Sequence, residues 1–85
     1  MSTATRLLDL EAFVATEYPR IVSAVRLITG DHEIAADAVE DAIVGLLANP
    51  PKNEPHNYAA YITVVASNKA RDILRRRGAD QRLGV

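Results

Sequence analysis

The last third of the sequence concentrates side chains suited to binding a nucleic acid. Asn68, Arg71 and Arg75 are spaced by three and four residues, so in a helix they share one face. The flanking polar side chains that extend this set are Ser67, Lys69, Arg76 and Arg77. Cationic residues in the last turn also suit the dipole of a helix. Spacing alone therefore leaves two interpretations open, a nucleic-acid contact or a solvated helix end.

A second constellation is acidic and lies earlier in the chain. Asp37, Glu40, Asp41 and Val44 fall at i, i+3, i+4 and i+7, so they too share one helical face. Three carboxylates around one apolar side chain could bind an arginine-bearing helix, because each guanidinium can fork onto a carboxylate. The alternative, a plain solvated acidic face, stays open on spacing alone.

Catalytic and metal-binding patterns are weak. His32 and His56 are isolated, and His32 with Glu33 and Asp37 matches no zinc or di-metal helix motif. The sequence has no cysteine, which excludes disulfides and thiolate metal sites, and it has no glycine-rich phosphate loop. We therefore expect no enzyme, no metal and no cofactor.

The composition favours one small helical domain. Of the 85 residues, 48% are apolar and 5% are aromatic, so the core must be built mainly from Leu, Ile, Val and Ala. Alanine-rich apolar content suits close-packed helices better than sheets. The first residues do not resemble a signal peptide, and no apolar run approaches the roughly 18 residues of a membrane span. We expect a cytoplasmic protein without a membrane partner.

The net charge of −1 conceals an asymmetry along the chain. Residues 1–56 hold four basic and nine acidic residues, a balance of −5, whereas residues 57–85 hold six basic and two acidic residues, a balance of +4. A chain divided in this way can offer an acidic face to one partner and a basic face to another.

Three helical segments are expected, over residues 7–28, 32–48 and 58–77. Pro19 predicts a kink or a fresh helix start in the first segment, with Thr16 as a cap for the second piece. Between the first two segments, Gly30 can take the left-handed conformation that closes a helix. Asp31 can then cap the next helix.

The remaining boundaries follow from proline and glycine. Pro50 and Pro51 stop the second segment, residues 49–57 form a polar loop of a length that often carries function, and Gly78 is expected to end the third. The apolar residues expected to face the core are Leu10, Phe13, Val14, Ile21, Val22, Val25, Ile28, Ala35, Ala38, Val39, Ala42, Ile43, Leu46, Ala59, Ile62, Ala66, Ala70 and Ile73, with Val65 at the edge.

Three blocks of the sequence resemble region 2 of the extracytoplasmic-function (ECF) sigma factors of bacterial RNA polymerase. Residues 30–47, GDHEIAADAVEDAIVGLL, resemble the family pattern G-D-x-x-x-A-E-D-L-V-Q-E-x-F-L-x-L-W. Residues 17–22, EYPRIV, resemble Y-Y-P-R-L-V. Residues 58–77, YAAYITVVASNKARDILRRR, resemble F-R-A-W-L-Y-T-I-A-R-N-x-A-x-D-x-L-R-R-R. The order of the blocks and the lengths between them are also compatible with the family.

This resemblance implies an all-α domain of three to four helices over residues 1–77, and two macromolecular partners. In the family, the region 2.2 helix binds the β′ clamp helices of core RNA polymerase, and Asp37, Glu40, Asp41 and Val44 occupy the matching positions. An anti-sigma factor could mask the same faces.

The resemblance also implies that the last helix and the loop before it engage the promoter −10 element and hold the melted non-template strand. The matching side chains are Asn68, Lys69, Arg71, Arg75 and Arg76. Basic side chains would follow the phosphates, and flipped bases would be read in the single strand. Asn53, His56 and Asn57 carry the polar groups that a base-reading loop would use.

The sequence departs from the family pattern at several positions. Tyr61 replaces a tryptophan, and Ile43 and Leu47 replace aromatic residues while keeping apolar bulk. Ser67 stands where arginine is usual and Gly45 where a basic or polar residue is usual. Residues 78–85 are expected to begin an inter-domain linker, and nothing in these 85 residues resembles region 4, which binds the −35 element in the family.

The rival interpretation is a sigma-like interaction module that binds polymerase or an anti-sigma factor without contacting DNA. The serine at position 67 and the mild overall charge favour it. Salt-dependent binding to single-stranded DNA would separate the two interpretations.

Overall fold

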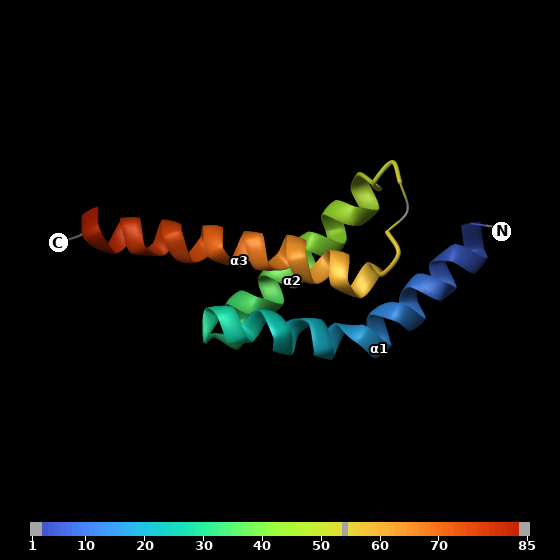
Figure 1. Cartoon of the computed structure of the whole chain (residues 1–85), viewed down its shortest axis with the longest axis horizontal. Coiled ribbons are helices and arrows are strands. Elements are labelled where there is room, and N and C mark those ends of the chain that lie inside the picture. Colours follow the sequence, from blue (N-terminus) through green and yellow to red (C-terminus); the bar gives the residue numbers. More distant parts are fainter. Residues whose placement is uncertain (1–2, 54, 84–85) are drawn as a thin grey trace.

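The computed structural model consists of three helices, as the expected all-α class requires. It describes the backbone of residues 3–53 and 55–83 and the side chains of residues 11–53 and 55–78. The helices are α1 (Thr3–Thr29), α2 (His32–Ala48) and α3 (Tyr58–Leu83), and each packs against the other two. Figure 1 shows α2 crossing α3, with the first part of α1 and the last part of α3 projecting in opposite directions. The molecule is elongated, with extents of 55 × 23 × 20 Å.

Helix α1 is continuous through Pro19. A proline inside a helix removes one backbone hydrogen bond and crowds the preceding turn, which bends the helix. The ribbon of α1 indeed changes direction midway along its length (Figure 1). The predicted kink is thus observed, but the predicted capping role of Thr16 is wrong because Thr16 lies inside the helix. Burial of Ile21 and Val22 after the bend holds the second half of α1 in place.

The turn between α1 and α2 forms as its sequence predicts. Gly30 adopts a φ of 68°, and it is the one described residue with a positive φ. The carboxylate of Asp31 caps α2, accepting hydrogen bonds from the backbone N–H groups of Glu33 at 2.8 Å and Ile34 at 3.2 Å. These bonds satisfy amides that have no partner within the helix.

The core is built from small and branched apolar side chains of all three helices. The buried apolar residues are Ile21, Val22, Val25, Ile34, Ala35, Ala38, Val39, Ala42, Ile62, Ala66 and Ala70. The alanines allow close approach of the helix backbones, and Val25, Val39 and Ile62 are the largest fully buried side chains. Apolar residues predicted for each of the three helices therefore contribute to one core. Leu10, also expected in the core, lies outside the residues whose side chains are described.

Three positions differ from the residues predicted to face the core, and one of them, Ile34, is buried although it was not predicted to be. Ile28, expected to face the core, is 39% exposed because it lies in the last turn of α1, where the helix leaves the bundle. Ser67, expected beside the basic face of α3, is only 7% exposed. Since both α1 and α2 pack on α3, the buried face of α3 is wide enough to include Ser67 beside Ala66 and Ala70.

Helix α3 starts where the sequence predicts and ends later. The side-chain oxygen of Asn57 accepts a hydrogen bond from the backbone N–H of Ala60 at 3.1 Å, so Asn57 caps the first turn. The predicted end at Gly78 is wrong, because α3 continues to Leu83. Gly78 keeps a negative φ, and a glycine inside a helix costs only about 1 kcal/mol relative to alanine. Within the described residues no helix is both long and apolar enough to cross a membrane.

Candidate functional site

The four residues Asp37, Glu40, Asp41 and Val44 form one exposed surface of α2, which we call the acidic face. All four side chains are exposed, and Val44 keeps 64% of its surface in contact with solvent. The opposite side of α2 carries the buried alanines and Val39. The same helical period that buries the core side thus presents the three carboxylates to solvent.

Tyr18 connects the acidic face to α1. Its hydroxyl donates a hydrogen bond to Oε1 of Glu40 at 3.2 Å, across 22 residues of sequence. The pKa of Tyr18 is raised, first because burial disfavours the charged phenolate, and then because the carboxylates of Glu40 and Asp37 lie nearby. The phenol, which is protonated at neutral pH with an ordinary pKa, therefore remains a donor to higher pH than usual. Sequence reasoning placed Tyr18 only in a matching block, because nothing local to it points to Glu40.

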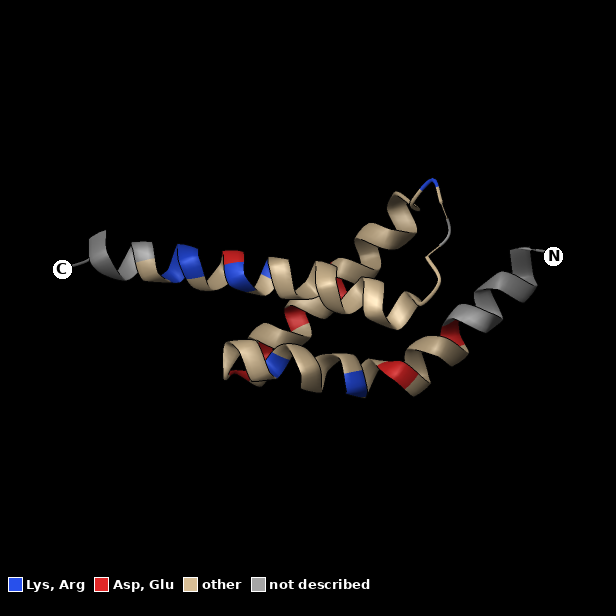
Figure 2. Cartoon of the chain, viewed as in Figure 1, with Lys and Arg blue, Asp and Glu red and all other residues tan. Residues whose placement is uncertain are grey.

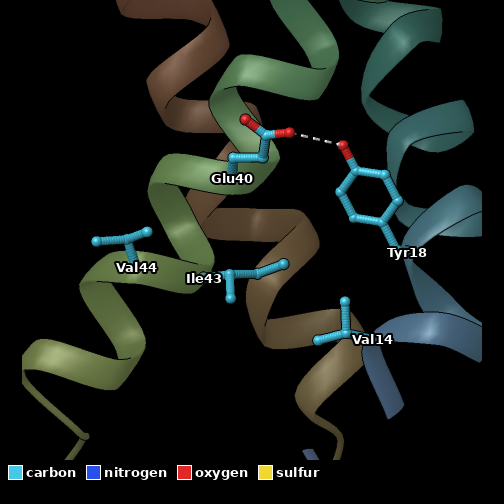
Figure 3. Close-up of a pocket in the computed structure, with 5 residues that line it drawn as sticks. All are labelled: Val14, Tyr18, Glu40, Ile43 and Val44. Atoms are coloured by element: carbon cyan, nitrogen blue, oxygen red, sulfur yellow. Dashed lines mark hydrogen bonds between the residues drawn. The ribbon is translucent and has the colours of Figure 1, made fainter. Parts of the chain in front are cut away.

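An apolar groove lies directly beside this hydrogen bond. Its lining is Val14 and Tyr18 from α1 with Glu40, Ile43 and Val44 from α2, and its volume is about 510 Å³. Figure 3 shows the five lining side chains, with the Tyr18 hydroxyl of α1 pointing at Glu40 of α2. Apolar side chains dominate the lining, so the groove offers a place for an apolar group next to a carboxylate.

The basic residues of α3 lie on a different surface of the molecule. We call the exposed side chains of Asn68, Arg71 and Arg75 the basic face. Figure 2 shows the cationic residues gathered along the projecting half of α3, while most acidic residues lie on α1 and α2. Lys69 is half-buried, which fits a side chain whose stem lies along the apolar stripe. The charge asymmetry of the sequence is therefore also an asymmetry in space.

The contacts of the basic face and of the neighbouring Arg76 are local to α3. Arg71 donates a hydrogen bond from Nη1 to Oδ1 of Asn68 at 3.4 Å, and Arg76 forms an ion pair with Asp72 at 2.9 Å. The side chains of Arg76 and Asp72 are 77% and 47% exposed. An exposed pair one turn apart contributes little to stability, so Arg76 can exchange Asp72 for another anion at small cost.

The loop before α3 carries Asn53 and His56 at its surface. Asn57, predicted with them as a base reader, already uses its amide oxygen to cap α3, which leaves its amide N–H₂ group for other contacts. Tyr58 lies edge-on to Phe13 of α1, with ring centroids 6.4 Å apart and planes inclined at 72°. This contact fixes the end of the loop against α1.

Among the described side chains, no group of three His, Asp or Glu residues is arranged so that it could hold a metal ion. The arrangement instead separates two exposed, oppositely charged surfaces on different helices. Such surfaces suit two macromolecular partners.

Comparison with known proteins supports this interpretation. Residues 13–79 match the family model of Sigma-70 region 2, a span that includes the acidic face, the loop and the basic face. No curated protein and no solved structure shows a significant match. Members of the matched family are non-enzymatic transcription initiation factors that take part in binding core RNA polymerase and in recognising the promoter −10 element. Because the match covers most of an all-α chain of the expected architecture, this protein belongs to the Sigma-70 region 2 family.

Proposed function

We propose that this domain acts as region 2 of an ECF-type sigma factor, with the acidic face docking on the β′ clamp helices of core polymerase. In the same proposal the loop 49–57 and the basic face hold the non-template strand of the −10 element. The observation that carries this proposal is the placement of the two charged surfaces on separate helices. Both partners can then bind at once, as transcription initiation requires.

The docking role of the acidic face is supported by its charge and by its lack of internal neutralisation. Within the described part of the chain, none of Asp37, Glu40 and Asp41 forms an ion pair. Each carboxylate is exposed and can form a bidentate contact with an arginine of a partner helix.

The ECF assignment is supported by the three sequence blocks, in particular GDHEIAADAVEDAIVGLL at residues 30–47.

The DNA-binding role rests on the exposed cations of α3 and on the polar loop that precedes it. Arg71, Arg75 and Arg76 are exposed and can neutralise phosphates, and the half-buried Lys69 can extend its ammonium group toward them. Asn68, Asn53 and His56 bring groups that can hydrogen-bond unstacked bases. The domain would act in the cytoplasm, where polymerase and promoter DNA are found, without a cofactor. An anti-sigma factor would inhibit it by covering either face.

A second candidate function is an interaction module that binds polymerase or an anti-sigma factor without contacting DNA. It is favoured by Ser67, which is buried where the family usually carries arginine, and by Asp72, which partly neutralises Arg76. Binding of a mixed-sequence single-stranded oligonucleotide, measured by fluorescence anisotropy at several salt concentrations, decides between the two. A steep loss of affinity with salt supports the DNA-binding role, whereas the absence of binding at low salt supports the interaction module.

The polymerase-docking role is tested by pull-down of core RNA polymerase. We expect wild type to capture polymerase and the Asp37→Arg/Asp41→Arg variant to fail, because both changes would repel a partner helix whose cations the carboxylates are proposed to bind. The matched control, Glu11→Arg/Glu33→Arg, makes the same change in net charge at exposed positions outside the acidic face. Equal capture by all three proteins, or no capture by wild type, would contradict the proposal.

A further inference from the structure

We propose that the groove between α1 and α2 seats one aliphatic side chain of the partner helix, and that Tyr18 is a positioning residue that holds Glu40 beside it. The inference rests on the proposed polymerase-docking role of the acidic face and extends the docking surface from one helix to two. The partner it specifies is an amphipathic helix of polymerase that carries an aliphatic residue about one turn from an arginine.

The groove has the chemistry of a seat for an aliphatic side chain. Val14, Ile43 and Val44 provide an apolar lining of which Val44 is 64% exposed, and the neighbouring Leu47 is 54% exposed. Covering such surface releases water and is favourable in proportion to the apolar area buried. In a folded domain of 85 residues, adjacent exposed valine and leucine on one helix mark a surface that a partner can cover.

The shape of the groove favours a helix over a small molecule as its occupant. All five lining residues belong to α1 and α2, so two helices form the groove and α3 does not close it. Pockets for small molecules enclose most of their ligand, which a groove of this kind does not do. An amphipathic helix laid along two helices is the recognition mode that an open apolar groove supports.

The carboxylates beside the groove favour an occupant that carries positive charge. Glu40 is itself part of the lining, and Asp37 and Asp41 lie within one turn of it on the same face of α2. Suppose that a partner helix places an aliphatic side chain between Val14 and Val44. The residues three or four positions away on that same helix then lie over these carboxylates. Arginine at those positions would meet a carboxylate with a planar, bidentate fork.

Tyr18 prepares Glu40 for that contact. A free glutamate side chain on a helix surface samples several rotamers, and fixing them on binding costs affinity. The hydrogen bond from the Tyr18 hydroxyl to Oε1 already restricts Glu40, and it leaves Oε2 for the guanidinium of the partner. A phenol with an ordinary pKa is already protonated at neutral pH, and the raised pKa of Tyr18 extends that state to higher pH.

The test measures the affinity of the domain for core polymerase, or for its β′ clamp fragment, by biolayer interferometry. Tyr18→Phe removes the hydroxyl and keeps the ring, so we expect a loss of affinity of roughly threefold, the scale of one exposed hydrogen bond. If Tyr18 acts through Glu40, the same change in a Glu40→Gln background has a smaller effect, which a double-mutant cycle detects. The unfolding midpoint of each variant is measured alongside, and it should not follow the loss of affinity.

The groove is tested by a matched pair of valines. Val44→Ser should weaken polymerase binding by about fivefold or more, since an apolar contact in the centre of the docking surface is lost. Val64→Ser makes the same change on α3, where Val64 is 61% exposed and lies outside the groove, and it should leave polymerase binding unchanged.

The outcomes separate this inference from the proposed function. If wild type and Val64→Ser bind while Val44→Ser and Tyr18→Phe are weakened, the groove and its positioning residue are supported. If Asp37→Arg/Asp41→Arg abolishes binding but Val44→Ser and Tyr18→Phe bind like wild type, the inference is overturned and the proposed function stands. If wild type does not bind polymerase, both are overturned.

Discussion

The acidic face of α2 and the basic face of α3 differ in what holds them in place. The acidic face depends on tertiary structure, because Tyr18 of α1 bonds Glu40 of α2 and the two helices together form the groove. The basic face depends on α3 alone, since Arg71 contacts Asn68, three residues away, and the neighbouring Arg76 contacts Asp72, four residues away. A specific docking surface needs fixed geometry, whereas attraction to phosphates tolerates motion. Substitutions in the two surfaces should therefore differ in their effects on stability and binding.

Loss of a core side chain should have the largest effect, because all three helices share one core. Ile62 is 1% exposed, and Ile62→Ala is expected to reduce the free energy of unfolding by about 2–5 kcal/mol. Urea denaturation followed by circular dichroism measures this change. The control is Val64→Ala on the same helix, 61% exposed, for which a change within about 0.5 kcal/mol is expected. Equal destabilisation by both substitutions would contradict the core described above.

Removal of charge from the basic face should come next in size. Arg71→Ala/Arg75→Ala is expected to weaken single-stranded DNA binding by roughly tenfold and to reduce the slope of log affinity against log salt by about 1.4. Arg20→Ala/Arg26→Ala removes the same charge from exposed positions on α1 and should change the slope much less. Fluorescence anisotropy at several salt concentrations measures both. Identical slopes for the two double variants would mean that only net charge matters.

Removal of the cap of α2, the helix that carries the acidic face, should have an intermediate effect on stability. Asp31→Ala loses the two hydrogen bonds to Glu33 and Ile34, which should cost about 1 kcal/mol of unfolding free energy. Asp41→Ala removes an equal charge from the same helix without removing a cap, and we expect a smaller change in stability. Thermal unfolding compares the two variants. A cap that contributed nothing would give them the same midpoint.

Release of Arg76 from its ion pair should have the smallest effect. Asp72→Asn removes the carboxylate that Arg76 contacts at 2.9 Å, so DNA affinity should rise by about twofold while stability changes by less than about 1 kcal/mol. The same anisotropy titration measures the gain. A loss of affinity would indicate that Asp72 orders Arg76 for DNA rather than competing with it.

Much of the fold could be predicted from local signals in the sequence. Gly30 and Asp31 form the predicted turn and cap, and α2 stops at Ala48 before the two prolines. Gly78 was misleading because a glycine can end a helix or continue within it, and the flanking residues decide. Pro19 bends α1 without ending it, since packing after the bend offsets one lost hydrogen bond.

The part of the candidate site that could be predicted from the sequence is the part formed by a single helix. The helical period places Asp37, Glu40, Asp41 and Val44 on one exposed face, as the structure also has them. The bond between Tyr18 and Glu40 and the groove beside it depend on how α1 packs on α2, which no local pattern encodes. Ser67 was misplaced for a related reason, because contact with two helices widens the buried side of α3.

The central claim is that the two charged surfaces bind different partners, and charge reversal on each surface tests it most directly. Core polymerase and a single-stranded oligonucleotide would each be titrated against Asp37→Arg/Asp41→Arg and against Arg71→Glu/Arg75→Glu. The account predicts that the first variant loses polymerase and keeps the oligonucleotide, while the second keeps polymerase and loses the oligonucleotide. If either variant lost both partners while remaining folded, or if neither lost its own partner, the assignment of one surface to each partner would be wrong.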